Sequence, residues 1–142
     1  MAHAIFADEV RKRSLAVTVY SAGVYDFSDA PRVLETSDTC RQHNTPAPEK
    51  APTFAGQLPL DSIDCFLVME QHHADVLTRE FGISPERVSL LGTFDPHRRG
   101  SEIADPFGQG KLVYERSYQL IRDCVIGYLD ATEEMKGQNR LR

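Results

Sequence analysis

Residues 63–69 have the sequence Ile-Asp-Cys-Phe-Leu-Val-Met, and this nearly continuous apolar run decides the fold class. Such a run is typical of a strand that is covered on both faces, whereas a strand with one wet face alternates in polarity. Residues 15–20 alternate between apolar and smaller residues and are rich in β-formers, and residues 88–91 form another short apolar run. We therefore expect three strands, at 15–20, 63–69 and 88–91.

Apolar residues recur at helical spacing in the segments that separate these strands and flank them. The predicted helices cover residues 2–13, about 28–42, 71–81 and 113–129. The second of them is expected to start at Ser28 with Pro31 in its first turn. Three prolines place residues 44–52 in a loop, and the polar tail over 130–142 is expected to fray. Strands that alternate with helices predict an α/β fold with a small parallel sheet.

The composition limits the classes of protein that remain. A chain of 142 residues with 41% hydrophobic residues fits one domain, and its net charge of −5 argues against nucleic acid or an anionic membrane as partner. No apolar run approaches the roughly 20 residues that span a bilayer, and residues 1–6 do not form a signal peptide. The three cysteines, Cys40, Cys65 and Cys124, make no CxxC pair, so we expect reduced thiols and a cytoplasmic protein.

The loop over residues 101–108, Ser-Glu-Ile-Ala-Asp-Pro-Phe-Gly, is the strongest candidate for chemistry. Pro106 disfavours the helical region for the residue before it, so the carboxylate of Asp105 is aimed at little entropic cost, as a general acid requires. Phe107 is placed either to shield this carboxylate from water or to flank a flat aromatic substrate. From this pattern alone, an Asp-Pro turn without chemistry is the more common meaning.

Other candidate sites are weaker. His72 and His73, with Glu70 and Asp75 nearby, suggest a metal, but adjacent histidines on a helix are expected to point in different directions. We therefore predict no metal site. Cys65 and Cys124 lie in apolar patterns and are expected in the core. The sequence contains no glycine-rich phosphate loop or dinucleotide fingerprint, so we also predict no cofactor.

Several blocks together resemble the low-molecular-weight protein-tyrosine phosphatases, over nearly the whole chain. Residues 90–96, Leu-Leu-Gly-Thr-Phe-Asp-Pro, are similar to the family's Leu-Leu-Gly-x-x-Asp-Pro, and residues 103–108 match its acid loop. The remaining blocks, in the same order as in the family, are residues 1–6, 21–23, 64–69 and 118–129. The resemblance implies a three-layer α/β sandwich of the phosphotyrosine protein phosphatase I type, with a small parallel sheet.

The resemblance also implies roles for single residues. In the family, a cysteine thiolate of a Cys-x5-Arg loop attacks phosphorus, and the aspartate of the Asp-Pro pair protonates the leaving oxygen and later activates water. Asp105 stands at this aspartate, Phe107 stands where an aromatic residue lines the substrate mouth, and Ser21 stands where a serine supports the phosphate loop. The implied partner is a phosphorylated protein or a phosphate-like anion. Phosphotyrosine is the default substrate, and phosphoarginine hydrolysis and arsenate reduction are alternatives.

The chain departs from the family pattern at its start. No cysteine is followed six positions later by an arginine, so the nucleophile, the phosphate cradle and the first, central strand of the family are missing. We therefore expect this chain to be inactive, and we expect Met1 to be an internal methionine of a longer natural protein. Residues 53–57, Thr-Phe-Ala-Gly-Gln, also differ from the family's His-x-Ala-Arg-Gln.

Two other functions stay open from the sequence. One is a non-catalytic binding module that uses the Asp105 loop and the proline-rich residues 44–52. The other is a shared fold ancestry with a different small-molecule role. Because a missing central strand leaves strand edges unpaired, the sequence further predicts a homodimer formed through these edges.

Overall fold

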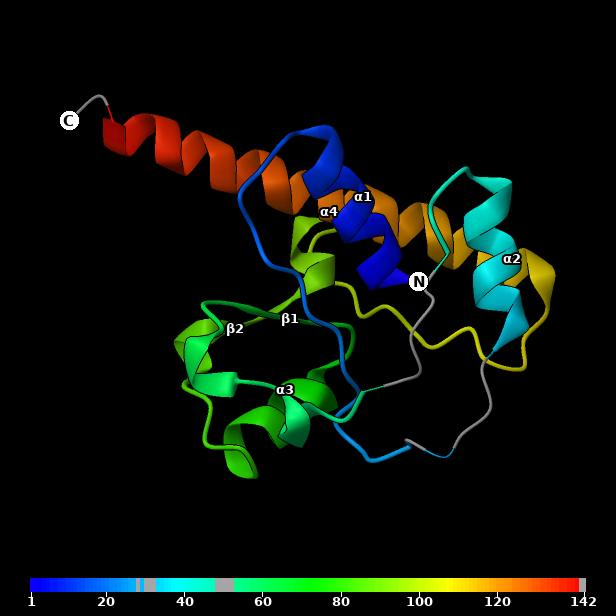
Figure 1. Cartoon of the computed structure of the whole chain (residues 1–142), viewed down its shortest axis with the longest axis horizontal. Helices are drawn as coiled ribbons and strands as arrows, with labels where there is room; N and C mark the ends of the chain where they lie inside the picture. The colour runs from blue at the N-terminus through cyan, green and yellow to red at the C-terminus, as the bar shows by residue number, and fades with distance from the viewer. Residues whose placement is uncertain (28, 30–32, 48–52, 141–142) are drawn as a thin grey trace.

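The computed structural model describes residues 1–27, 29, 33–47 and 53–140 (Figure 1). Within these ranges it contains four α-helices, two strands and four short 3₁₀ turns. The helices are α1 (Ala2–Lys12), α2 (Leu34–Gln42), α3 (Gln71–Arg79) and α4 (Lys111–Arg140). The strands are β1 (Phe66–Val68) and β2 (Val88–Leu90), and the 3₁₀ turns are η1 (Ala55–Gln57), η2 (Leu60–Ser62), η3 (Pro85–Arg87) and η4 (Leu91–Phe94).

The two strands form a parallel sheet, which confirms the predicted α/β class. Phe66 lies opposite Val88 and Val68 lies opposite Leu90, and α3 makes the crossover between the strands. Parallel strands require such a crossover because the chain must return to the same end of the sheet. Both observed strands are shorter than the apolar runs that predicted them.

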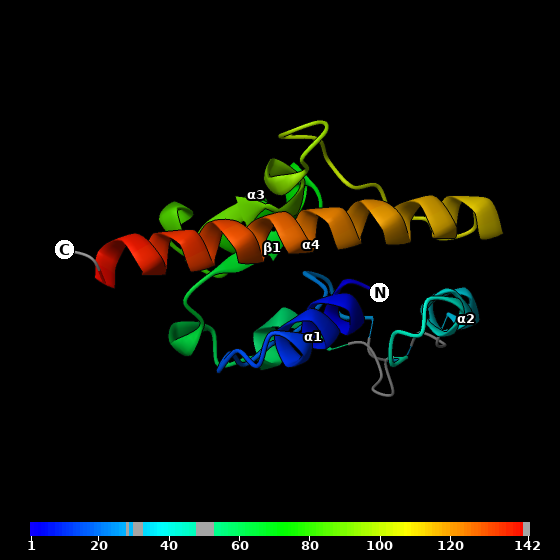
Figure 2. The same cartoon turned by 90° about the horizontal axis from the view of Figure 1, so that it is seen from above.

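Apolar side chains cover both faces of the sheet, as the run at residues 63–69 predicted. Leu67 and Met69 pack against the larger core, whereas Phe66 and Val68 pack beneath α3 with Leu77. Seen from above, α1 and α2 lie together on one side of the strands, and α4 runs along the molecule (Figure 2). The larger core joins α1, α2 and α4 and contains Ala4, Ile5, Val10, Cys40, Leu91, Ile103, Tyr118, Ile121, Cys124, Val125 and Leu129.

Residues 15–20 do not form a strand, so this prediction was wrong. Figure 1 shows the segment after α1, drawn in blue, as an irregular trace, and Val17 and Tyr20 are 43% and 47% exposed. The β-forming residues of this segment favour an extended backbone. A strand forms, however, only where a neighbouring strand completes its backbone hydrogen bonds. Among the described residues, the segment after α1 meets such a neighbour only at Gly23, which forms a parallel bridge with Phe54.

The polar tail after residue 129 is helical through Arg140, which corrects the expectation that it frays. Arg13, directly after α1, donates hydrogen bonds to Asp130 at 2.6 Å and to Glu133 at 2.7 Å. These two ion pairs connect the end of α1 to the last turns of α4. The sequence of the tail alone does not predict its contact with Arg13, because Arg13 lies almost 120 residues away in the sequence.

The second helix is shorter than predicted, because Val33, inside the predicted range, is extended and precedes the first helical residue. The observed α2 begins at Leu34, and the predicted start at Ser28 and Pro31 lies outside the described residues. Of the predicted loop at 44–52, residues 44–47 are irregular and 48–52 lie outside the described residues. No helix in the described part of the chain is long and apolar enough to cross a membrane.

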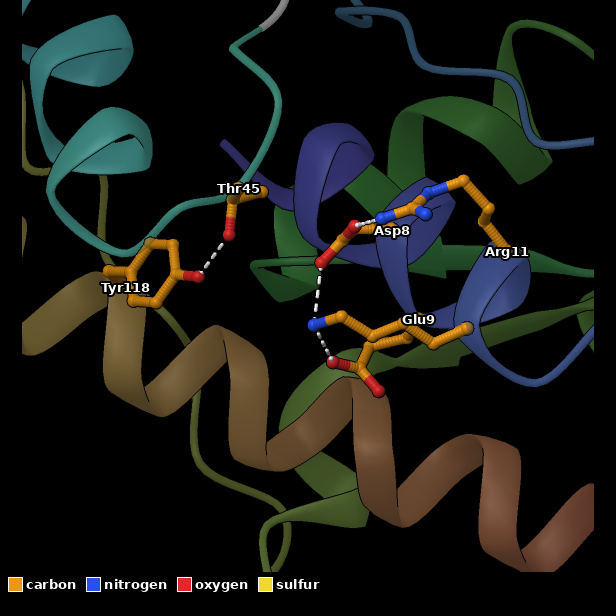
Figure 3. Close-up of polar contacts among 6 residues, drawn as sticks. Asp8, Glu9, Arg11, Thr45 and Tyr118 are labelled. Carbon is orange, nitrogen blue, oxygen red and sulfur yellow. Dashed lines mark hydrogen bonds and ion pairs between the residues drawn. The ribbon is translucent and has the colours of Figure 1, made fainter.

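The end of α2 docks on α4 through polar groups that are removed from water. The hydroxyl groups of Thr45 and Tyr118 form a buried hydrogen bond (Figure 3), and the ring of His43 stacks on Tyr118 with centroids 4.0 Å apart. His43 Nε2 also pairs with Glu115 at 2.6 Å. Because buried hydroxyl groups are costly when unpaired, this contact fixes how α2 sits against α4.

Candidate functional site

The loop that carries Asp105 is anchored at the end of β1. The side chain of Ile103 is buried in the core, and its N–H donates to the carbonyl of Met69 at 2.9 Å. One residue earlier, a carboxylate oxygen of Glu102 accepts a hydrogen bond from the N–H of Gln71, at the start of α3, at 2.7 Å. The loop therefore begins at the carboxyl end of the sheet, where parallel α/β folds bind their ligands.

Asp105 itself lies on the surface, two residues beyond this anchor. Its Oδ1 accepts a hydrogen bond from the N–H of Phe107 at 3.0 Å, and its carbonyl accepts one from Gln109 Nε2 at 3.3 Å. This is the side-chain turn that an Asp-Pro sequence favours, and it orients the carboxylate. The ring of Phe107 is 68% exposed and Asp105 is exposed too, so the ring is placed to flank a ligand and not to enclose the acid.

Asp105, Phe107 and Ser21 line one large cavity of about 2020 Å³. Its walls come from α1, residues 15–24, the region around β1 and one side of α4. The structure thus brings the three sequence-predicted site residues to a common space, although Ser21 follows an irregular segment and not a strand. The space between residues 15–20 and β1 belongs to this cavity.

Carboxylates outnumber cations among the described residues that line the cavity. The carboxylates are Asp8, Asp64, Glu70, Asp105 and Glu133, and the cations are Arg11 and Lys136. Arg11 is itself paired with Asp8 at 2.6 Å. Such a wall repels a phosphate dianion, because like charges raise its free energy wherever water screens them incompletely.

Cys40 and Cys124 do not supply an activated thiolate. Burial raises the pKa of Cys40, and burial together with Asp95 and Asp123 raises the pKa of Cys124 to about 11. Both thiols are therefore protonated near neutral pH and unreactive. Cys65, which was expected in the core, is instead exposed and lines the cavity, since none of the described residues forms a strand over this edge of the sheet.

Glu70, His72 and His73 cluster at the start of α3. Candidate ligand atoms of the three side chains all lie within 4.8 Å of one another, and the imidazole centroids are 4.0 Å apart. Burial and the neighbouring His72 lower the pKa of His73, against the opposing effect of Glu70, Asp105 and Glu102. The expectation that adjacent histidines point apart was wrong, because His73 Nδ1 accepts a hydrogen bond from the N–H of Glu70, which turns the ring back toward the start of the helix beside His72.

The family model of the low molecular weight phosphotyrosine protein phosphatases matches residues 1–140. The chain therefore belongs to this family of protein-tyrosine-phosphatase hydrolases. Its fold and the order of its sequence blocks agree with that assignment.

Known proteins show the same relationship. The chain is 28% identical to low molecular weight protein-tyrosine phosphatase A of Mycobacterium tuberculosis over 145 residues, which cover 98% of this chain and 86% of that protein. It resembles the structure of the YwlE arginine phosphatase from Geobacillus stearothermophilus with a TM-score of 0.78 at 21% identity, covering 95% of this chain and 86% of that one. Vibrio vulnificus Wzb in complex with benzylphosphonate gives a TM-score of 0.78 at 19% identity, with 92% and 87% covered.

Proposed function

We propose that Asp105 is the general acid of a low-molecular-weight phosphatase domain, and that the polypeptide with this sequence does not hydrolyse phosphomonoesters by itself. One observation carries both halves of the proposal. The acid loop is presented at a cavity whose described wall holds more carboxylates than cations, in a sequence where no cysteine is followed six positions later by an arginine. An acid without a nucleophile and without an anion cradle cannot complete the reaction.

In the family reaction, a thiolate sulfur forms a bond to phosphorus while the bond from phosphorus to the leaving oxygen breaks. The role proposed for Asp105 is to give its proton to that oxygen and then to take a proton from the water that cleaves the S–P bond. Phe107 would flank the departing side chain, and Ser21 would support the phosphate-binding loop. The positions of all three residues along one cavity support these roles.

The substrate class follows from the family, and its finer identity is part of the proposal. A phosphorylated protein side chain is the substrate that we expect of the complete site, with phosphotyrosine as the default. Phosphoarginine is the alternative, because the structurally similar YwlE protein is an arginine phosphatase. Arsenate reduction is a further alternative, and it too depends on a reactive thiol.

The first test measures turnover of p-nitrophenyl phosphate, a phosphotyrosine peptide and a phosphoarginine peptide by the purified chain. We expect rates equal to those of buffer, because loss of a nucleophile costs on the order of a million-fold in other enzymes. The Asp105→Asn variant should give the same rates. Turnover above buffer that disappears in Asp105→Asn would overturn the proposed inactivity.

A second test isolates the role of Asp105. A chimera that places the strand and Cys-x5-Arg loop of the mycobacterial relative before residue 1 should turn over p-nitrophenyl phosphate. Asp105→Asn in that chimera should lower kcat by about 10²–10⁴-fold, the range for general acid catalysis. Asp61→Asn, which changes an exposed carboxylate in η2, serves as the matched control and should leave kcat unchanged. An active chimera that is indifferent to Asp105→Asn would remove this residue from the mechanism.

The non-catalytic binding module is the second candidate function. The exposed ring of Phe107 beside a fixed Asp105 favours it, because an exposed aromatic residue is a common anchor for a partner. Titration of the chain with a phosphotyrosine peptide and its unphosphorylated form separates the two cases. Tight binding of the phosphotyrosine peptide that Phe107→Ala abolishes, without any turnover, would support the binding module. It would count against a catalytic role for the acid loop.

A further inference from the structure

The junction between β1 and α3 places three metal-ligating side chains next to one another, outside the acid loop. Glu70 precedes α3, and His72 and His73 lie in its first turn. Glu70 Oε2 is 3.8 Å from His72 Nδ1, and one ligand atom from each of the three side chains lies within 4.8 Å of the others. Three donor groups therefore converge on one space from within four consecutive positions, 70–73.

We propose that Glu70, His72 and His73 form a zinc-binding site. Two imidazole nitrogens and one carboxylate oxygen are a donor set that suits Zn²⁺ and related divalent transition metals, with the fourth position left to water. The hard cations Mg²⁺ and Ca²⁺ prefer an all-oxygen set, which this cluster does not offer. The site is independent of whether Asp105 acts as an acid.

The charges around the cluster favour a cation. Glu70 Oε2 lies 3.8 Å from His72 Nδ1, and the carboxylate of Glu102 accepts a hydrogen bond from the N–H of Gln71, between Glu70 and His72. The N-terminal end of α3 opposes a cation, but this effect is about 0.3–1 kcal/mol for an exposed site. Since two carboxylates act against one helix end, the balance of these charges is attractive.

Small side-chain movements are enough to close the site. Ligand atoms that bind Zn²⁺ at about 2.1 Å in a tetrahedron lie about 3.4 Å apart, so separations of up to 4.8 Å must shorten. The side chain of His72 is 51% exposed and that of Glu70 is 28% exposed, which leaves room for this adjustment. The hydrogen bond that His73 Nδ1 accepts from the N–H of Glu70 is long, at 3.3 Å, so its loss costs little.

The acid loop is tied to the same junction. The N–H of Gln71, between two of the ligands, donates to Glu102, and Met69 accepts the hydrogen bond from Ile103. When the three side chains draw together around Zn²⁺, these two contacts transmit the change to the loop. We therefore expect Zn²⁺ to shift the amide resonances of Glu102 and Asp105 as well as those of the ligands.

The experiment titrates the full chain with Zn²⁺ alone, in competition with a chromogenic chelator. We expect one equivalent to bind with a dissociation constant in the micromolar range, and we expect Co²⁺ to give the visible absorption of a low-coordinate nitrogen and oxygen site. His72→Gln and His73→Gln should each weaken Zn²⁺ binding at least tenfold. His97→Gln, which removes an exposed histidine from another loop, is the matched control and should bind as the parent chain does.

Circular dichroism of each variant checks that it is folded before binding is compared. Should His73→Gln unfold, His72→Gln and Glu70→Gln decide the question, because the side chain of His72 is half exposed and that of Glu70 is accessible. Binding weaker than millimolar in the parent chain would overturn the proposal. Micromolar binding that is unchanged in both His72→Gln and Glu70→Gln would overturn it too, since the metal would then lie elsewhere.

Discussion

Asp8 and Asp38 make the same local ion pair in very different surroundings. Each aspartate pairs with an arginine three residues later on a helix, Asp8 with Arg11 at 2.6 Å and Asp38 with Arg41 at 3.0 Å. The side chain of Asp8 is 4% exposed and also pairs with Lys12, whereas that of Asp38 is 64% exposed. Figure 3 shows Asp8 and Glu9 on α1 with the cationic groups drawn against them. Burial makes these otherwise equal pairs unequal in energy.

We expect Asp8→Asn to lower the free energy of unfolding by about 1–2 kcal/mol, because it weakens hydrogen bonds that charged partners make to a buried carboxylate. Asp38→Asn, the matched control, should change it by less than about 0.5 kcal/mol, as exposed ion pairs do. Urea denaturation at pH 7 measures both values. Equal effects in the two variants would show that the burial of Asp8 does not matter.

The same residue predicts a pH dependence. Burial alone raises the pKa of Asp8, but the hydrogen bonds from Lys12 and Arg11 outweigh it, so that its pKa lies below the ordinary value of 3.8. A carboxyl group with a lowered folded pKa stabilises the fold fully above its unfolded pKa and loses this contribution as the pH falls through the folded pKa. The stability difference between the parent chain and Asp8→Asn should therefore shrink as the pH falls below about 4.

At the scale of elements, α4 holds the molecule together because it packs against α1, α2 and η4. Its two glycines show where this packing is tight. A Cβ atom added at Gly127 would lie 2.3 Å from the carbonyl oxygen of Phe94 in η4, whereas one added at Gly137 would meet nothing within 4 Å. The missing side chain at Gly127 therefore lets the helix approach the backbone of η4 closely.

We expect Gly127→Ala to destabilise the protein by about 1–3 kcal/mol, since neither the backbone of α4 nor that of η4 can easily move aside for the added methyl group. Gly137→Ala on the same helix should instead be neutral or stabilising by up to about 1 kcal/mol, because alanine is the better helix former. Urea unfolding curves of the two variants separate packing from propensity. If both substitutions stabilise, the close approach of α4 to η4 is absent in solution.

At the scale of the whole molecule, the small sheet leaves strand edges unpaired among the described residues. Within the described residues, β1 pairs along one edge with β2, and residues 15–20 join no ladder. Unpaired edges of this kind tend to recruit strands from other molecules. The large cavity beside β1 and the exposed side chains of Val17 and Tyr20 leave this region accessible to a strand from another molecule.

We therefore predict that the chain forms a homodimer through these edges at concentrations of about 100 µM, in keeping with the tendency of exposed strand edges to pair. Val17→Lys places a charge at the exposed segment and should shift the molecule to a monomer. Leu34→Lys, which changes a residue of α2 that is 72% exposed, is the control and should leave the dimer intact. Light scattering that shows a monodisperse monomer for the parent chain would contradict the prediction.

The sequence by itself determined the family, the α/β class and the existence of all four helices and of the strands at 66–68 and 88–90. These features depend on local patterns, such as the two-sided apolar run around Leu67 and the Asp-Pro-Phe loop, and each pattern is contained in a few adjacent residues. The proposed roles of Asp105, Phe107 and Ser21 come from the same source, and the structure adds that the three residues line one cavity.

Only the tertiary structure decided which of the local tendencies were realised. Residues 15–20 have the composition of a strand but remain irregular, and no described residue pairs with them in a ladder, whereas α4 continues through the polar residues after 129, where Arg13 pairs with Asp130 and Glu133. The same holds for Cys65, which is exposed beside an open sheet edge, and for His72 and His73, which converge where helical periodicity alone predicts divergence. For residues 15–20, the tail and Cys65, the deciding contacts involve residues distant in sequence, so a local pattern carries no information about them; the two histidines instead converge through the local geometry at the start of α3.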